Sequence, residues 1–125
     1  GTVADSMGKF KLLWTNPNPS NSWASGTNIT GISDDYDYYI MRCVGHTSRP
    51  AFIHDFMIFK QTDSTDRNDI INGIIFNYVS EAKCTNAYRI IKYKNGTFYV
   101  GDGTVEDLTT DNAFLVPFQI YGVKL

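Results

Sequence analysis

The sequence has little of what most chemical sites and several fold classes require. Only two of its 125 residues are cysteines, and neither Cys43 nor Cys84 belongs to a CxxC motif or lies near a histidine cluster, so zinc and redox centres have little support. The net charge is −2 without a basic cluster, which makes nucleic acid and anionic membranes poor partners. No apolar run approaches the ~20 residues that span a bilayer, and residues 1–9 lack the apolar stretch of a signal peptide.

The composition favours strands over helices. Helix-favouring Leu, Ala, Glu and Lys are sparse, whereas aromatic residues make up 14% of the chain. A chain of this length has room for one domain with one core. Residues 1–9 are small and polar and predict a lead-in or linker, which leaves 10–125 as the domain.

Turn-forming residues separate about eight segments of strand-like composition. They predict an all-β fold, an antiparallel β-sandwich of jelly-roll type, with an open barrel as the nearest competitor. The predicted strands are residues 10–14, 29–33, 38–44, 51–60, 70–79, 84–94, 97–101 and 113–125.

Several local signals refine this prediction. Asn95-Gly96 is a strong hairpin signal, because a type I′ turn needs positive φ at both central residues. Pro117 lacks an N–H group and predicts an edge, a bulge or a sheet switch. Residues 51–60 carry large apolar groups on both faces, as do residues 70–79, which is typical of a strand that is either central and covered or buried in a subunit interface.

The two cysteines lie in predicted strands. We expect two buried thiols, as is usual for cysteines outside a disulfide framework. A bridge between Cys43 and Cys84 stays open as an alternative, because it would form only if the two strands were neighbours.

No constellation predicts catalysis. His54 and Asp55 are adjacent on a predicted strand and therefore point to opposite faces, so we expect His54 to be a core or interface histidine. Most acidic residues lie in loops, where solvated turn and capping roles are expected. Asp34, Asp35 and Asp37 would need several further oxygens to hold a calcium ion. We therefore expect no enzyme, no cofactor and no metal.

Trp23, in the polar loop at 15–28, is the most informative loop aromatic. Exposed tryptophans stack on sugar rings and anchor interfaces, but the alternative is that Trp23 folds back as a plug over the end of the sandwich. Strict up-and-down alternation, with residues 29–33 as a strand, places both termini at one end. The loops expected at the opposite end are 15–28, 46–50, 80–83 and 102–112. Without that strand, the later loops swap ends, and 61–69 joins the loop at 15–28 in the distal set. The residues predicted to contact a ligand there are Trp23, His46, Arg49, Glu106 and Asp107.

Two pieces of the sequence carry a family resemblance. Residues 10–20 read Phe-Lys-Leu-Leu-Trp-Thr-Asn-Pro-Asn-Pro-Ser, and residues 116–124 read Val-Pro-Phe-Gln-Ile-Tyr-Gly-Val-Lys. With the strand segments at 36–42 and 98–103, they resemble the C-terminal domains of tail and tail-fibre proteins of tailed bacteriophages and of prophages in Gram-positive gut bacteria. The resemblance covers nearly the whole chain, although the polar loop at 61–69 departs from a typical member.

The resemblance implies a module at the distal end of a phage tail or fibre, commonly homotrimeric, that touches the host cell and brings no catalytic residues. It predicts a receptor-binding tip on the virion, extracellular when it acts, that recognises a cell-surface glycan, teichoic acid or protein. A structural module that trimerises and caps a fibre is the main alternative. A secreted carbohydrate-binding module comes third, because a signal peptide is missing, and a depolymerase comes last.

Overall fold

A computed structural model describes residues 9–60, 72–79, 84–106 and 109–125, and only the backbone of residues 72–79, 84 and 85. These residues form strands and no helix, which confirms the all-β prediction. They accordingly contain no helix with the length and apolar character needed to cross a membrane. The strands are β1 (Phe10–Thr15), β2 (Tyr38–His46), β3 (Arg49–Phe59), β4 (Asn72–Val79), β5 (Cys84–Lys94), β6 (Thr97–Val100), β7 (Thr104–Val105) and β8 (Phe114–Val123).

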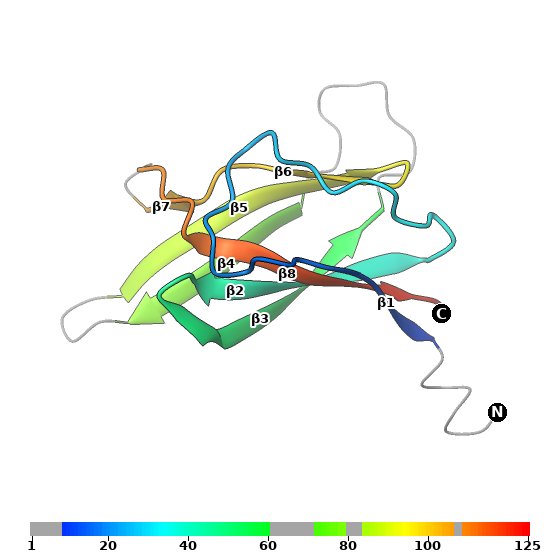
Figure 1. The fold of residues 1–125 in the computed structure, drawn as a ribbon, viewed down its shortest axis with the longest axis horizontal. Helices are drawn as coiled ribbons and strands as arrows, with labels where there is room; N and C mark the ends of the chain where they lie inside the picture. Colours follow the sequence, from blue (N-terminus) through cyan, green and yellow to red (C-terminus); the bar gives the residue numbers. More distant parts are fainter. Residues whose placement is uncertain (1–8, 61–71, 80–83, 107–108) are drawn as a thin grey trace.

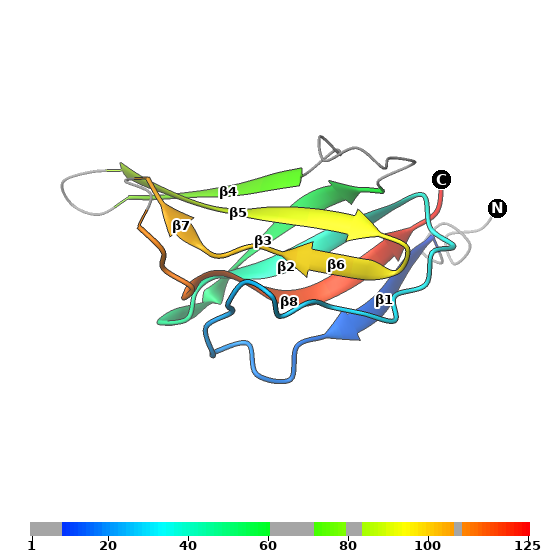
Figure 2. The same cartoon turned by 90° about the horizontal axis from the view of Figure 1, so that it is seen from above.

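The strands form two antiparallel sheets that lie face to face (Figures 1 and 2). The first sheet has the order β1-β8-β2-β3, and the second has the order β4-β5-β6, with β7 also paired to β5. Because the described strands divide into two separate sheets, they match a sandwich and not the open barrel. The start of β1 and the end of β8 lie at one end of the sandwich (Figure 1), where the Lys124 amide donates to the Lys9 carbonyl at 3.0 Å.

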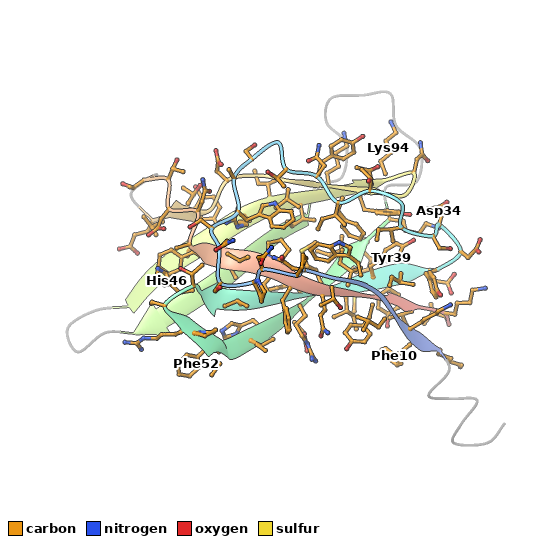
Figure 3. The ribbon with its side chains drawn as sticks, in the orientation of Figure 1. Phe10, Asp34, Tyr39, His46, Phe52 and Lys94 are labelled. Carbon is orange, nitrogen blue, oxygen red and sulfur yellow. The ribbon has the colours of Figure 1, made fainter. Side chains whose placement is uncertain are left out.

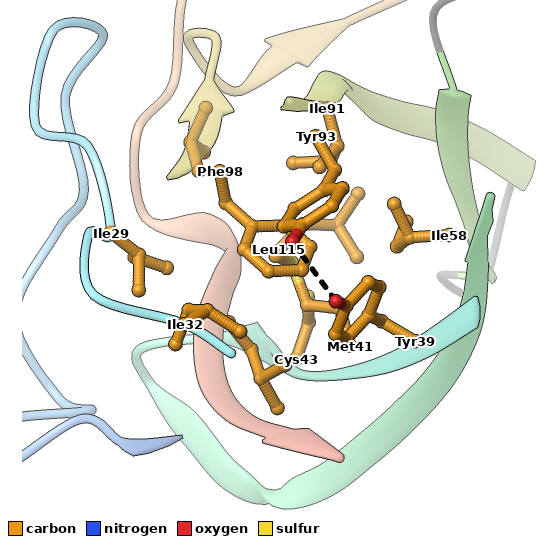
Figure 4. Packing of buried hydrophobic residues seen from close by; sticks show 12 residues of the cluster. Ile29, Ile32, Tyr39, Met41, Cys43, Ile58, Ile91, Tyr93, Phe98 and Leu115 are labelled. Carbon is orange, nitrogen blue, oxygen red and sulfur yellow. Dashed lines mark hydrogen bonds between the residues drawn. The ribbon is translucent and has the colours of Figure 1, made fainter. Parts of the chain in front are cut away.

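The core fills the space between the two sheets (Figure 4). Alternate residues of β2, namely Tyr39, Met41 and Cys43, are fully buried, and Ile91 and Tyr93 of β5 join the same cluster from the other sheet. Burying a large apolar side chain contributes roughly 1.5–3 kcal/mol, so this two-sided alternation accounts for much of the stability. The other members of the core cluster are Ile29, Ile32, Ile58, Phe98, Val100, Leu115 and Ile120.

Cys43 confirms the prediction of a buried thiol. Its side chain is fully buried and its thiol is free, and burial raises the pKa of that thiol. Cys84 begins β5, but its side chain lies outside the described part of the chain. His54 is half-buried on β3 and lies opposite Cys43 in the register, in keeping with a core histidine.

Asn95 and Gly96 form the predicted hairpin turn between β5 and β6. Both have positive φ, at 50° and 84°, as a type I′ turn requires. A Cβ at Gly96 would lie only 2.8 Å from the Ile32 carbonyl oxygen, so the turn packs directly against the neighbouring segment.

The predicted strand at residues 29–33 is wrong. Gly31 adopts a left-handed φ of 74°, which interrupts the extended backbone, and Ile29 makes only an isolated bridge with Phe98. The two bridge hydrogen bonds measure 3.0 and 2.7 Å, and the Ile32 amide donates to the Gly96 carbonyl. This segment therefore runs antiparallel to β6 as a strand would. The start of β1 and the C-terminus consequently lie opposite the loops that follow β1 and β2.

The two-sided apolar strand at 51–60 is not central. It corresponds to β3, which lies at the edge of the first sheet. The β2–β3 hairpin places β3 on one side of β2, and β8 occupies the other side. Phe52 and Met57 are 56% and 50% exposed. Of the two alternatives predicted for residues 51–60, a central, covered strand is therefore excluded.

The two stretches that carry the family resemblance meet at Asn16. Its side-chain amide donates to the Pro117 carbonyl at 2.9 Å, and its backbone amide donates to the Phe118 carbonyl at 2.8 Å. Its side-chain oxygen accepts a hydrogen bond from the Asn18 amide at 2.8 Å. The β2–β8 register shifts between Arg42 and Cys43, beside Pro117, which confirms the predicted bulge.

We expect Asn16→Ala to lower the free energy of unfolding by about 1–3 kcal/mol, because it leaves the buried Pro117 carbonyl without its donor. Urea denaturation at neutral pH measures the change. Asn18→Ala is the matched control, since only the backbone amide of the exposed Asn18 takes part in this junction. Equal losses in the two variants would contradict the role of the Asn16 side chain.

Candidate functional site

The loops at the end opposite the chain termini are held by one buried arginine. Arg89 of β5 is fully buried, and its guanidinium donates to four backbone carbonyls. The acceptors are Phe114 at 2.9 Å, Trp23 at 2.7 Å, Gly101 at 2.7 Å and Asn112 at 2.9 Å. Only arginine offers five donors in a rigid planar fork, so this residue can bind several carbonyls from different loops at once.

The loops that meet at Arg89 are also joined directly. The Trp23 amide donates to the Asn112 carbonyl at 2.9 Å, and the Ser25 amide donates to the Asp102 carboxylate at 2.7 Å. Gly103 allows the chain to pass close to Asp111, because a Cβ at this position would collide with the Asp111 carbonyl oxygen. Residues 16–28, 101–106 and 109–113 therefore form one hydrogen-bonded platform, which we call the loop platform.

Burial has an electrostatic cost at this position. It lowers the pKa of the Arg89 guanidinium to about 10, while the nearby carboxylates of Asp102 and Asp111 partly oppose the shift. The group stays protonated at neutral pH, and its charge is balanced mainly by carbonyl dipoles. Removing the guanidinium would be costly, because the carbonyl acceptors would then have no donor while staying shielded from water.

Trp23 folds back against the end of the sandwich, which is the alternative that the sequence left open beside an exposed side chain. Its side chain is half-buried against the core, with its ring centroid 5.9 Å from that of Trp14 in an edge-on contact. Its indole N–H donates to the Thr27 carbonyl at 2.9 Å. Most of the ring is thus committed to packing and is a poor platform for a sugar.

His46 and Arg49 lie together at the β2–β3 hairpin, where they pair in the strand register. The half-buried His46 ring packs edge-on against Phe114, with 4.6 Å between centroids, and its Nδ1 accepts from the Ser48 amide at 3.0 Å. Arg49 is exposed. Figure 3 shows His46 at the end of the molecule away from Asp34.

The remaining predicted residues lie beyond the two-residue strand β7. Glu106 is exposed in the turn after it, and Asp107 lies outside the described residues. Among the described residues, no hydrogen bond or ion pair joins Glu106 to the β2–β3 hairpin, so the described members of the predicted set share one end of the molecule but do not form one tight cluster.

Sequence reasoning missed Phe52 as a surface residue. It is 56% exposed and lies at the same end as His46 (Figure 3). The apolar character of both faces of residues 51–60 was a signal that the strand needs an additional partner. Composition alone could not show which side chains stay uncovered.

The three aspartates considered for calcium lie near the chain termini. Asp34 accepts a hydrogen bond from the Tyr93 hydroxyl at 2.7 Å and pairs with Lys60, and the Asp37 carboxylate accepts from the Leu125 amide. The Tyr93 hydroxyl also lies 2.9 Å from that of Tyr39 (Figure 4). The Asp34 and Asp37 carboxylates thus bind protein partners.

The described side chains include no group of three or more His, Cys, Asp or Glu that could hold a metal ion. Comparisons with protein-family models, curated proteins and solved structures found no match for this chain.

We expect Arg89→Met to lower the free energy of unfolding by about 2–4 kcal/mol, because several buried carbonyls lose a charged donor at once. Arg89→Lys should recover only part of this loss, since lysine cannot reach four carbonyls in one plane. Urea denaturation measures both changes, and Arg49→Met is the exposed control. A loss for Arg89→Met no larger than for Arg49→Met would contradict the assignment.

The Asp34 contact predicts a pH dependence of stability. The hydrogen bond from Tyr93 and the charge of Lys60 lower the pKa of Asp34 below its ordinary value of 3.8. Its contribution is therefore present above about pH 4 and is lost as the pH falls through the lower pKa of the folded state.

Asp34→Asn should accordingly lower the free energy of unfolding at neutral pH, and with it Tm. The loss of free energy should be no more than about 1 kcal/mol, because the carboxylate is largely exposed. The difference from the unmodified protein should shrink in thermal denaturation below about pH 4. Asp35→Asn serves as the neighbouring control. A difference that stays constant with pH would contradict the role of the Asp34 charge.

Proposed function

We propose that this domain is the distal module of a bacteriophage tail or tail fibre and that it binds a receptor on the host cell surface without catalysing a reaction. The observation that carries the proposal is the separation of the two ends of the sandwich. Lys9 and Lys124 are hydrogen-bonded at one end, and the loop platform organised by Arg89 lies at the other. A fibre joined through the N-terminal residues would present that platform and the adjacent hairpin to the host.

The side chains at the β2–β3 hairpin give this proposal its chemistry. Arg49 is exposed, Phe52 is 56% exposed, and His46 is half-buried beside them. A guanidinium beside an aromatic ring suits a glycan or teichoic acid, because the ring stacks on sugars and the guanidinium binds phosphate or carboxylate. Trp23 acts in this proposal through the packing of the platform and not through direct contact.

We propose in addition that the sandwich is a variant of the jelly roll. The pairing of β1 with β8 and the bridge between Ile29 and Phe98 support this, because they link the beginning of the chain to its last strands in both sheets. The hairpins β2–β3 and β4–β5 each stay within one sheet, so the middle of the chain follows a simpler path.

Structural assembly of a fibre is the second candidate function. It is favoured by the exposed apolar side chains of β1 and β3, among them Phe10 at 52% and Met57 at 50%. The proteins that this sequence resembles are commonly homotrimers, and we include self-association in the proposal. Assembly and receptor binding use different surfaces and are compatible.

Binding of the purified domain to susceptible cells tests the receptor proposal. We expect Arg49→Ala combined with Phe52→Ala to weaken binding by about thirtyfold, the effect of losing a contact of ~2 kcal/mol. Tyr99→Ala is the matched control, because Tyr99 is an aromatic residue that is 46% exposed on the second sheet. Unchanged binding by the double variant would exclude the hairpin, and no binding by the unmodified domain would contradict the function.

A further inference from the structure

The outer face of the first sheet, which points away from the second sheet, is apolar over much of its area. Because Tyr39, Met41 and Cys43 point into the core, the alternate residues of β2 point outward. The strand register aligns them with outward residues of the other strands in rows. One row contains Phe10, Val123, Tyr38 and Phe59, and the next contains Leu12, Tyr121, Ile40 and Met57.

Much of this face is open to solvent within a single chain. Phe10, Leu12, Ile53 and Met57 are 52%, 45%, 41% and 50% exposed. The half-buried side chains of Tyr38, Ile40 and Tyr121 lie between them, whereas Val123 is buried within its row. Monomeric proteins rarely expose continuous apolar patches larger than a few hundred Å².

The charges on the face identify the kind of partner. The Arg42 guanidinium donates to Asp55 at 2.8 and 3.3 Å and lies 5.6 Å from the centre of the Tyr121 ring. This pair has no net charge, so the face offers no attraction to a polyanion or a basic surface. A second copy turned about an axis through the face would instead bring each Arg42 towards the Asp55 of the other copy. The pattern is self-complementary, as a two-fold contact between identical chains requires.

We propose that the outer face of the first sheet is where copies of this chain pack against one another, with the apolar rows at the centre of the contact. This inference deepens the self-association part of the proposed function and does not depend on a host receptor. Copies arranged about an axis parallel to the strands would keep all chain termini at one end and all loop platforms at the other. The proposal also gives β3 the subunit-interface role that its two-sided apolar sequence requires.

Gel filtration coupled to light scattering at micromolar concentration tests the proposal on the full chain. We expect the unmodified protein to have a mass that is a multiple of 14.1 kDa. Met57→Lys and Leu12→Lys should each weaken association at least tenfold, because a charge in an apolar contact is desolvated without a partner. Ile90→Lys is the matched control, since Ile90 is 49% exposed on the second sheet.

The outcomes separate this inference from receptor binding. A monomeric unmodified protein would overturn the self-association surface even if it still bound cells. Loss of the assembly in Ile90→Lys with retention in Met57→Lys would place the contact on the other sheet and overturn it as well. Circular dichroism of each variant distinguishes dissociation from unfolding, and a folded monomer for Met57→Lys with an assembled Ile90→Lys supports the proposal.

Discussion

The buried guanidinium of Arg89 is the interaction on which the loop end of this molecule depends. It binds carbonyls from the loop after β1, from the residue after β6 and from the segment that enters β8. Those segments also bond to one another directly, as Trp23 does to Asn112, and Arg89 adds one charged donor that all of them share. A buried cation is unfavourable without compensating contacts, and the four charge-assisted hydrogen bonds make this arrangement specific.

Arg89 also accounts for a strained residue in the last strand. Leu115 is fully buried and has a left-handed φ of 53°, a conformation that costs a side-chain-bearing residue roughly 1–3 kcal/mol. The Arg89 bond to the carbonyl of Phe114 and the burial of Leu115 in the core hold it there. The strained residue thus lies where the chain leaves the loops and enters the first sheet as β8.

The molecule separates three physical environments. The loop end is polar and rich in hydrogen bonds to backbone, the end with the chain termini contains the Tyr39–Tyr93–Asp34 contacts, and the outer face of the first sheet is apolar. Such separation allows binding at the loops and packing of copies along the sheet without competition. Asn16 joins the end of β1 to β8 beside the bulge at Pro117.

The sequence by itself determined the all-β class, the turn at Asn95-Gly96, the buried thiol of Cys43 and an irregularity near Pro117, where an edge, a bulge and a sheet switch stayed open. Each follows from local chemistry: strand-forming composition, positive φ, a missing N–H or a small apolar side chain. Only the tertiary structure decided that Gly31 interrupts the strand at residue 29, that Trp23 packs against Trp14, and that β3 lies at an edge with Phe52 exposed. It also turned Arg89, one basic residue among others in the sequence, into the centre of the loop platform. These features depend on which distant segments meet, and pairing between distant segments leaves no local pattern in the sequence.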